Sequence, residues 1–218
     1  MKKLLLLLTL SLLVLLNATA FAQDEERDLL ELSFWGGMGV PSGDIKDFSD
    51  SLGAKSRYSI GGEIGYFFTP DIVVGFSVTY YDFGIDNNPN DTQAEGLTHR
   101  LYSPSIYGKY IVPTESDFSP YVKAHVGLDY AKFTTFVTNP AGDRYRQLSY
   151  DPSLSYGIGA GLFYFTNDYS GLFAEIDYHM ASTSDATHSY EGNDYVFGAN
   201  TAVLDLRIGL RLLFGSDE

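Results

Sequence analysis

Acidic, basic and imidazole side chains recur at every second position in several apolar stretches of this 218-residue sequence. The stretch that ends at Phe214 alternates large hydrocarbons with Asp205, Arg207 and Arg211. Because successive side chains of a β-strand point to opposite faces, this spacing gathers the ionisable groups on one face. The ionisable residues on this face of the predicted strands are Glu31, Glu63, Lys109, Lys123, His125, Asp129, Glu175, Asp177, His179, Asp205, Arg207 and Arg211.

Carboxylates next to lysine, arginine and histidine in one confined space support two kinds of chemistry. They can form a network of salt bridges and hydrogen bonds, because buried charges require partners. They can also line a pore or a proton-linked gate. We favour the network, since a barrel of eight strands is only wide enough for its own side chains. The pore stays open as the alternative.

Spacings suited to nucleophilic catalysis are poor in this sequence. His179 and Ser182 are three residues apart and would face opposite sides of a strand, while His188 and Ser189 lie in a polar stretch predicted to be a loop. A nucleophile requires its base within hydrogen-bond distance, about 3 Å. We therefore predict that the protein is not an enzyme.

The sequence predicts no metal, cofactor or nucleic acid as a ligand. The segments DNNPND at 86–91 and EGND at 191–194 contain oxygen ligands, but neither has the spacing of a known calcium loop, so we interpret both as turns. The formal net charge of −14 argues against a nucleic-acid partner. Cysteine is absent, which excludes disulfides and a lipid-modified cysteine.

Residues 1–22 have the organisation of a secretory signal peptide. Two lysines are followed by an apolar run from Leu4 to Leu16 and by Ala20-Phe21-Ala22, a small-residue cleavage motif. The run is too short for a membrane-spanning helix, which requires about 20 apolar residues. We expect a mature chain that starts at Gln23 and forms one domain over 23–218.

Period-two alternation predicts an all-β domain of eight strands. Polar connections alternate between long and short, as in an up-and-down antiparallel barrel with long loops at one end and short turns at the other. The predicted strands cover about 29–39, 58–68, 72–84, 98–112, 120–137, 152–166, 171–182 and 201–214. The long connections are 40–57, 85–97, 138–151 and 183–200, and the short ones are 69–71, 113–119 and 167–170.

Three observations indicate that the apolar face of this barrel is outside. Several segments run 11 to 15 residues, whereas globular strands have about 5 to 6 and tilted membrane-spanning strands about 9 to 11. Large apolar residues from eight strands would overfill so narrow a bore. Glycines such as Gly61, Gly65, Gly157 and Gly161 share the polar face, where a crowded interior favours small residues. A soluble periplasmic ligand-binding barrel, with its leucines inside, is the alternative.

Three stretches of sequence carry a resemblance to a known family: LSFWGGMGVPSGD, LSYGIGAGLFYF and LDLRIGLRLLF. With them the mature chain resembles the outer-membrane β-barrels that include the transmembrane domain of outer membrane protein A and the opacity-type surface proteins. The resemblance implies a Gram-negative outer-membrane location and lipids as neighbours. It also implies periplasmic chaperones and the outer-membrane assembly machinery as partners during biogenesis, although Gly215–Glu218 follow the usually terminal Phe214. The expected role is structural or surface-interacting, with four long outer loops; a porin for small solutes or hydrophobic compounds is the alternative.

Overall fold

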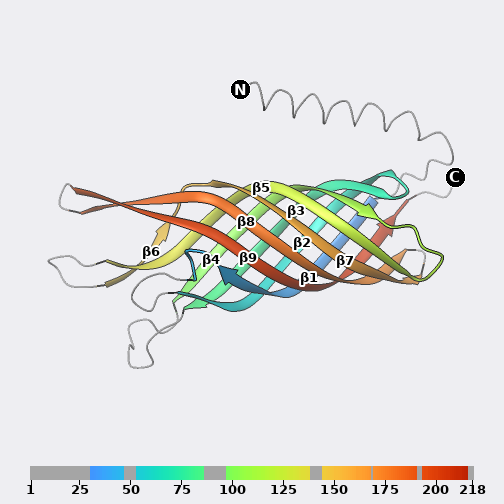
Figure 1. Cartoon of the computed structure of the whole chain (residues 1–218), viewed down its shortest axis with the longest axis horizontal. Helices are drawn as coiled ribbons and strands as arrows, with labels where there is room; N and C mark the ends of the chain where they lie inside the picture. The colour runs from blue at the N-terminus through green and yellow to red at the C-terminus, as the bar shows by residue number, and fades with distance from the viewer. Residues whose placement is uncertain are drawn as a thin grey trace, which may run out of the picture.

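The computed structural model describes residues 30–46, 53–85, 97–137, 144–167, 169–190 and 193–215. In this part of the chain, long tilted antiparallel strands wrap into one elongated barrel (Figure 1). The strands are β1 (Leu30–Ser42), β2 (Ala54–Thr69), β3 (Ile72–Ile85), β4 (Thr98–Ile111), β5 (Phe118–Val137), β6 (Arg144–Ser149), β7 (Ser153–Asn167), β8 (Ser170–Tyr190) and β9 (Asn193–Phe214).

The barrel closes because β1 pairs with both β2 and β9, and β4 pairs with β5. β6 and β7 occupy one position in the wall, since both pair with the same side of β5. Pro152 lies in the interruption between them and has no N–H group to donate to a ladder. The nine strands therefore fill eight positions around the barrel wall, and we call each position a stave. This arrangement confirms the predicted eight-stranded antiparallel up-and-down barrel.

Two of the connections predicted to be loops contain strands instead. Residues 183–190 and 193–200 extend β8 and β9 as one long hairpin, and β6 lies within the predicted loop 138–151. The predicted position of His188 and Ser189 in a loop is therefore wrong, because both belong to β8 and Ser189 is opposite Asp194. A long connection that folds back on itself satisfies its own backbone hydrogen bonds. The Ser, Thr, Asp and Gly content of these segments hides the alternation.

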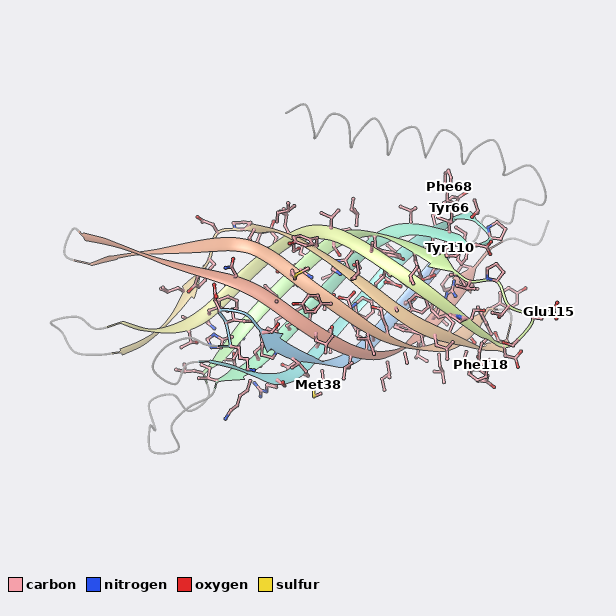
Figure 2. The ribbon with its side chains drawn as sticks, in the orientation of Figure 1. Met38, Tyr66, Phe68, Tyr110, Glu115 and Phe118 are labelled. Carbon is pink, nitrogen blue, oxygen red and sulfur yellow. The ribbon has the colours of Figure 1, made fainter. Side chains whose placement is uncertain are left out.

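The two faces of each strand differ in polarity, as β9 illustrates. Leu206, Ile208 and Leu210 are exposed on the outer face, with Ile208 71% accessible, whereas Arg207 and Arg211 are buried inside. The outer wall carries rows of exposed aromatic and aliphatic side chains from all eight staves. Tyr66, Tyr110 and Phe118 project outward near the end of the barrel that carries the short turns (Figure 2).

Glycines on the inner face make room for large aromatic rings. A Cβ atom on Gly61 would overlap the ring of Trp35, and one on Gly161 would overlap Tyr121. Gly43 is used differently: its φ of 75° turns the chain after β1, and Ile45 then enters the barrel and is fully buried.

Some predictions concern residues outside the described part of the chain. The signal peptide at 1–22 and the oxygen-rich segment 86–91 are among them, as are residues 191 and 192 of the second such segment. Among the residues that are described, no helix is long and apolar enough to cross a membrane.

Candidate functional site in the barrel interior

Three glutamates and two lysines from five strands meet in the middle of the barrel. Lys109 Nζ on β4 donates to Glu63 Oε1 on β2 at 2.6 Å and also to Glu31 Oε1 on β1. Lys123 Nζ on β5 donates to Glu175 Oε1 on β8 at 2.6 Å and lies 3.6 Å from Glu63 Oε2. All five side chains are at least 96% buried, so these ion pairs form a bridge across the bore.

Arg207 on β9 is the most highly connected cation of the interior. Its Nη1 donates to Glu175 Oε1 at 2.9 Å, its Nε donates to Asp205 Oδ2 at 2.6 Å, and its Nη2 donates to Asp177 Oδ1 at 3.2 Å. Nη2 also donates to the hydroxyl oxygen of Tyr81 at 3.0 Å. A guanidinium presents five N–H donors in a rigid fork, which suits a site with several carboxylates.

Two histidines stack on the side of this bridge that faces the long hairpins, and each lies next to an aspartate. The rings of His125 and His179 have centroids 5.4 Å apart and planes 8° apart. His125 Nε2 lies 3.2 Å from Asp177 Oδ2, and His179 Nε2 lies 2.8 Å from Asp129 Oδ2. The interior set contains six carboxylates and four lysine or arginine cations.

The structure places all twelve of these predicted residues inside the barrel. Eleven are buried and His125 is partly accessible as a residue, although its side chain is only 6% exposed. Arg211 Nη2 is 2.9 Å from Glu31 Oε2, and its guanidinium carbon is 4.0 Å from the Phe163 ring centroid. Such a cation over an aromatic face is electrostatically favourable.

Apolar side chains close both ends of this charged middle. We call the set near the short turns the turn-end cluster; its buried members are Trp35, Val73, Tyr107, Ile111, Tyr121, Phe163 and Phe173. The set near the long hairpins is the loop-end cluster, with Ile45, Ala54, Tyr81, Phe83, Leu101, Ala131, Phe133, Tyr150 and Val203. Period-two alternation does not predict these clusters; the available signal was that two large aromatic residues, Trp35 and Tyr107, fall on the polar face.

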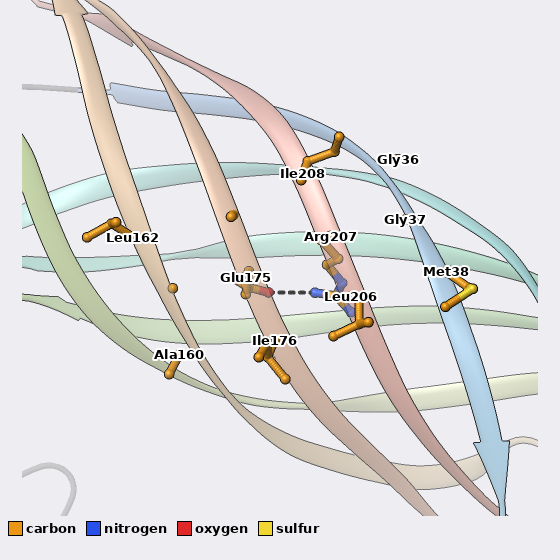
Figure 3. A pocket seen from close by; sticks show the side chains of 12 residues that line it. Gly36, Gly37, Met38, Ala160, Leu162, Glu175, Ile176, Leu206, Arg207 and Ile208 are labelled. Atoms are coloured by element: carbon orange, nitrogen blue, oxygen red, sulfur yellow. Dashed lines mark hydrogen bonds and ion pairs between the residues drawn. The ribbon is translucent and has the colours of Figure 1, made fainter.

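The outer wall over β7, β8, β9 and β1 is apolar, with a shallow depression (Figure 3). Leu206, Ile208 and Ile176 border the depression, while Glu175 and Arg207 meet on the inner side of the wall. The wall is thin here because Gly36, Ala160 and Ala174 carry small side chains or none.

The residues considered for catalysis and calcium binding lie mostly outside the part of the chain whose side chains are described. The side chain of Ser182 lies outside the described residues, as do those of His188 and Ser189. Within the described residues, no group of three His, Cys, Asp or Glu side chains is placed to hold a metal ion.

Comparison with known protein families decides the classification. The family model for the outer membrane protein β-barrel domain matches residues 8–200, most of the chain. The chain belongs to this outer-membrane β-barrel family. The predicted location in the outer membrane is thereby confirmed, and the apolar outer wall contradicts the alternative of a soluble periplasmic barrel.

Solved structures of other outer-membrane barrels resemble this family member in fold. Neisserial surface protein A is 19% identical, with a TM-score of 0.59, over 87% of this chain and all of its own. The outer membrane protein AlkL is 16% identical, with a TM-score of 0.55, over 90% of this chain and 94% of its own. OprG from Pseudomonas aeruginosa is 14% identical, with a TM-score of 0.52, over 89% of this chain and all of its own. No curated protein sequence matches the chain.

Proposed function

We propose that this outer-membrane barrel is a closed structural and surface-interacting protein and not a porin. The observation that carries the proposal is the layering of the interior, where ion-paired side chains fill the middle and apolar clusters occupy both ends. A hydrated ion would have to displace both the apolar side chains and the partners of each buried charge. Each such step is costly, because charges taken from their partners inside a protein lose their compensation.

The surface that meets other molecules is, in this proposal, the end of the barrel that carries the long hairpins. The β8–β9 hairpin and the β5–β6 hairpin extend beyond the last pairs that their strands make with neighbouring staves. In Figure 1 both project from the end of the barrel opposite the short turns. Membrane barrels carry their short turns in the periplasm, so these hairpins face the cell exterior.

We further infer that the protein is not an enzyme. The family to which the chain belongs, and the solved structures that resemble it, are outer-membrane barrel proteins. The partners that we propose are the lipids around the outer wall and, during biogenesis, periplasmic chaperones and the assembly machinery. The assembly machinery would recognise the closing strand β9, which ends at Phe214.

Conductance in planar lipid bilayers tests whether the interior is closed. We expect the purified barrel to give no channel activity above that of the bilayer alone. The matched variants are Tyr121→Ala with Phe163→Ala, which thin the turn-end cluster, and the loop-end pair Phe83→Ala with Phe133→Ala. Either pair alone should leave the conductance at background, because the opposite cluster and the ionic middle still fill the bore. Steady channel openings by the unmodified protein would favour the porin alternative instead.

A further inference from the structure

The wall of the barrel divides at the end that carries the long hairpins. β6 continues the stave of β7 and lies between β5 and β8, yet among the described strands it pairs only with β5. Over residues 184–190, all of them described, β8 likewise pairs with β9 alone. Some Cα atoms of β6 and β8 approach within 8 Å, and Figure 1 shows that the two hairpins diverge. We call this separation of two unpaired strand edges the wall split.

Both staves that border the wall split contain one extra residue where the split begins. From Asp129 to Lys132, β5 advances three residues, whereas the β6–β7 stave opposite it advances four. From Ala181 to Ser184, β8 advances three residues, whereas β9 opposite it advances two. Because Ser155 is opposite Ala181, both irregularities begin just beyond the last β7–β8 pair. An extra residue bends a strand and increases its twist, which turns its edge away from a neighbour.

The two extra residues compensate each other, so the edges of β6 and β8 remain in register. The β7–β8 ladder ends with Ser155 opposite Ala181. Eight residues further out along each stave, Gln147 of β6 comes opposite Ser189 of β8. An unmatched extra residue would shift one strand by one position and turn its side chains to the other face. Because the irregularities match, β6 can extend the β7–β8 ladder with no change of register.

Two features of the sequence at the base of the wall split oppose pairing of its edges. Pro152 has no N–H group that could be donated to β8. In the same register Asp151 comes opposite Asp185, and like charges at directly opposed positions destabilise a strand pair. The unpaired N–H and C=O groups of each edge can meanwhile be satisfied by water. Open and paired arrangements of β6 and β8 therefore differ little in free energy.

We propose that the wall split is the open state of a two-state closure, in which β6 pairs with β8 and separates from it again. In the closed state β5, β6, β8 and β9 form one continuous sheet, and both edges of the split are paired. In the open state two rows of backbone donors and acceptors face solvent, and such edges are templates for pairing with another chain. The carboxylates of Asp151 and Asp185 favour the open state. Closure thereby controls how much pairing surface this end of the barrel presents.

Disulfide trapping in the folded barrel tests the closure, and the sequence contains no cysteine that would interfere. Gln147→Cys with Ser189→Cys should form a disulfide within one chain, because opposed positions of paired strands have Cβ atoms about 4.5–5.5 Å apart. The register control is Gln147→Cys with Thr187→Cys, a diagonal pair about 7–8 Å apart in the closed state, which should be trapped more slowly. Thr187→Cys with Val196→Cys, opposite each other in the β8–β9 ladder, gives the rate for strands that are already paired.

Neutralising the two carboxylates should shift the closure toward the paired state. Asp151→Asn with Asp185→Asn should raise the trapping rate of the Gln147→Cys, Ser189→Cys pair about two- to five-fold, the effect of removing one opposed pair of like charges. Glu115→Gln removes a carboxylate at a short turn and should leave the rate unchanged. Hydrogen–deuterium exchange measures the same shift without added thiols: the amides of β6 should exchange more slowly in the double asparagine variant.

Heat-modifiable gel mobility shows whether each variant is folded, and the exchange measurement decides the matter if the cysteine variants do not fold. The closure is overturned if Gln147→Cys with Ser189→Cys stays reduced in folded barrels while the β8–β9 pair is trapped. It is also overturned if the diagonal pair is trapped equally fast, because the hairpins would then meet without a defined register. A disulfide that joins two chains, or unchanged trapping and exchange in the double asparagine variant, contradicts the proposal as well.

Discussion

The inner and outer faces of β9 are built from the same run of residues but meet different surroundings. Outside, Leu206 and Ile208 face the lipid; inside, Arg207 makes contacts to carboxylates on β8 and on its own strand. The outer face requires only that its side chains be apolar, because fluid acyl chains adapt to any shape. The inner face requires particular partners at particular distances. Single substitutions should therefore cost different amounts on the two faces, even where the chemical change is the same.

Removing the central cation should have the largest effect. Arg207→Met leaves Glu175, Asp177 and Asp205 without their shared partner, and breaking a buried ion pair costs about 3–5 kcal/mol. We expect a drop of that size in the free energy of unfolding, measured by urea titration in lipid vesicles. Adding Asp177→Asn and Asp205→Asn should recover part of the loss. A single variant as stable as the unmodified barrel would show that the network contributes nothing.

The reverse experiment places a cation on the lipid-facing side of the same strand. Ile208→Arg puts a charge where the side chain is 71% accessible on the outer face, and arginine near the midplane costs about 2–4 kcal/mol. Ile208→Leu is the matched control and should unfold at the same urea concentration as the unmodified protein. If the arginine variant did so too, this face would be in contact with water.

The same truncation on both faces sharpens the comparison with the smallest expected difference. Leu101 is fully buried in the loop-end cluster, and Leu101→Ala should cost about 3–5 kcal/mol because a cavity remains. Leu206→Ala should cost about 2 kcal/mol, the transfer of the lost carbons alone, since lipid fills the space. Equal losses in the same urea assay would mean that lipid packs against the wall as rigidly as protein does.

Alternation was sufficient to predict the barrel but not the depth of each side chain within it. The repeat of Leu204 to Phe214 assigns each residue to a face, because parity depends only on neighbours along the chain. Whether an inward residue lies in the ionic middle or at an apolar end depends on strand register, which the sequence does not encode locally. For that reason alternation alone does not explain the large aromatic residues Trp35 and Tyr107 on the polar face, whereas in the structure they belong to the turn-end cluster.

The pairing of individual charges was also beyond the sequence. Lys109 and Glu31 are 78 positions apart and meet only because the wall curves round on itself. The extended hairpins were missed for a different reason. Residues 183–200 are rich in Ser, Thr and Asn, so their sequence lacks the alternation of large apolar residues that marks the membrane-spanning strands.

The seam between β1 and β9 determines the order in which this chain can be made and assembled. It joins the first described residue, Leu30, to Phe214 and continues to the pair of Ser42 with Ala202, so its contacts span 160 to 184 positions. Until the ribosome has released the last stave, β1 has no partner on that side. Because contacts between residues so distant in sequence form slowly, we expect the barrel to close late in folding. A newly exported chain must therefore be kept from self-association along its whole length before insertion begins.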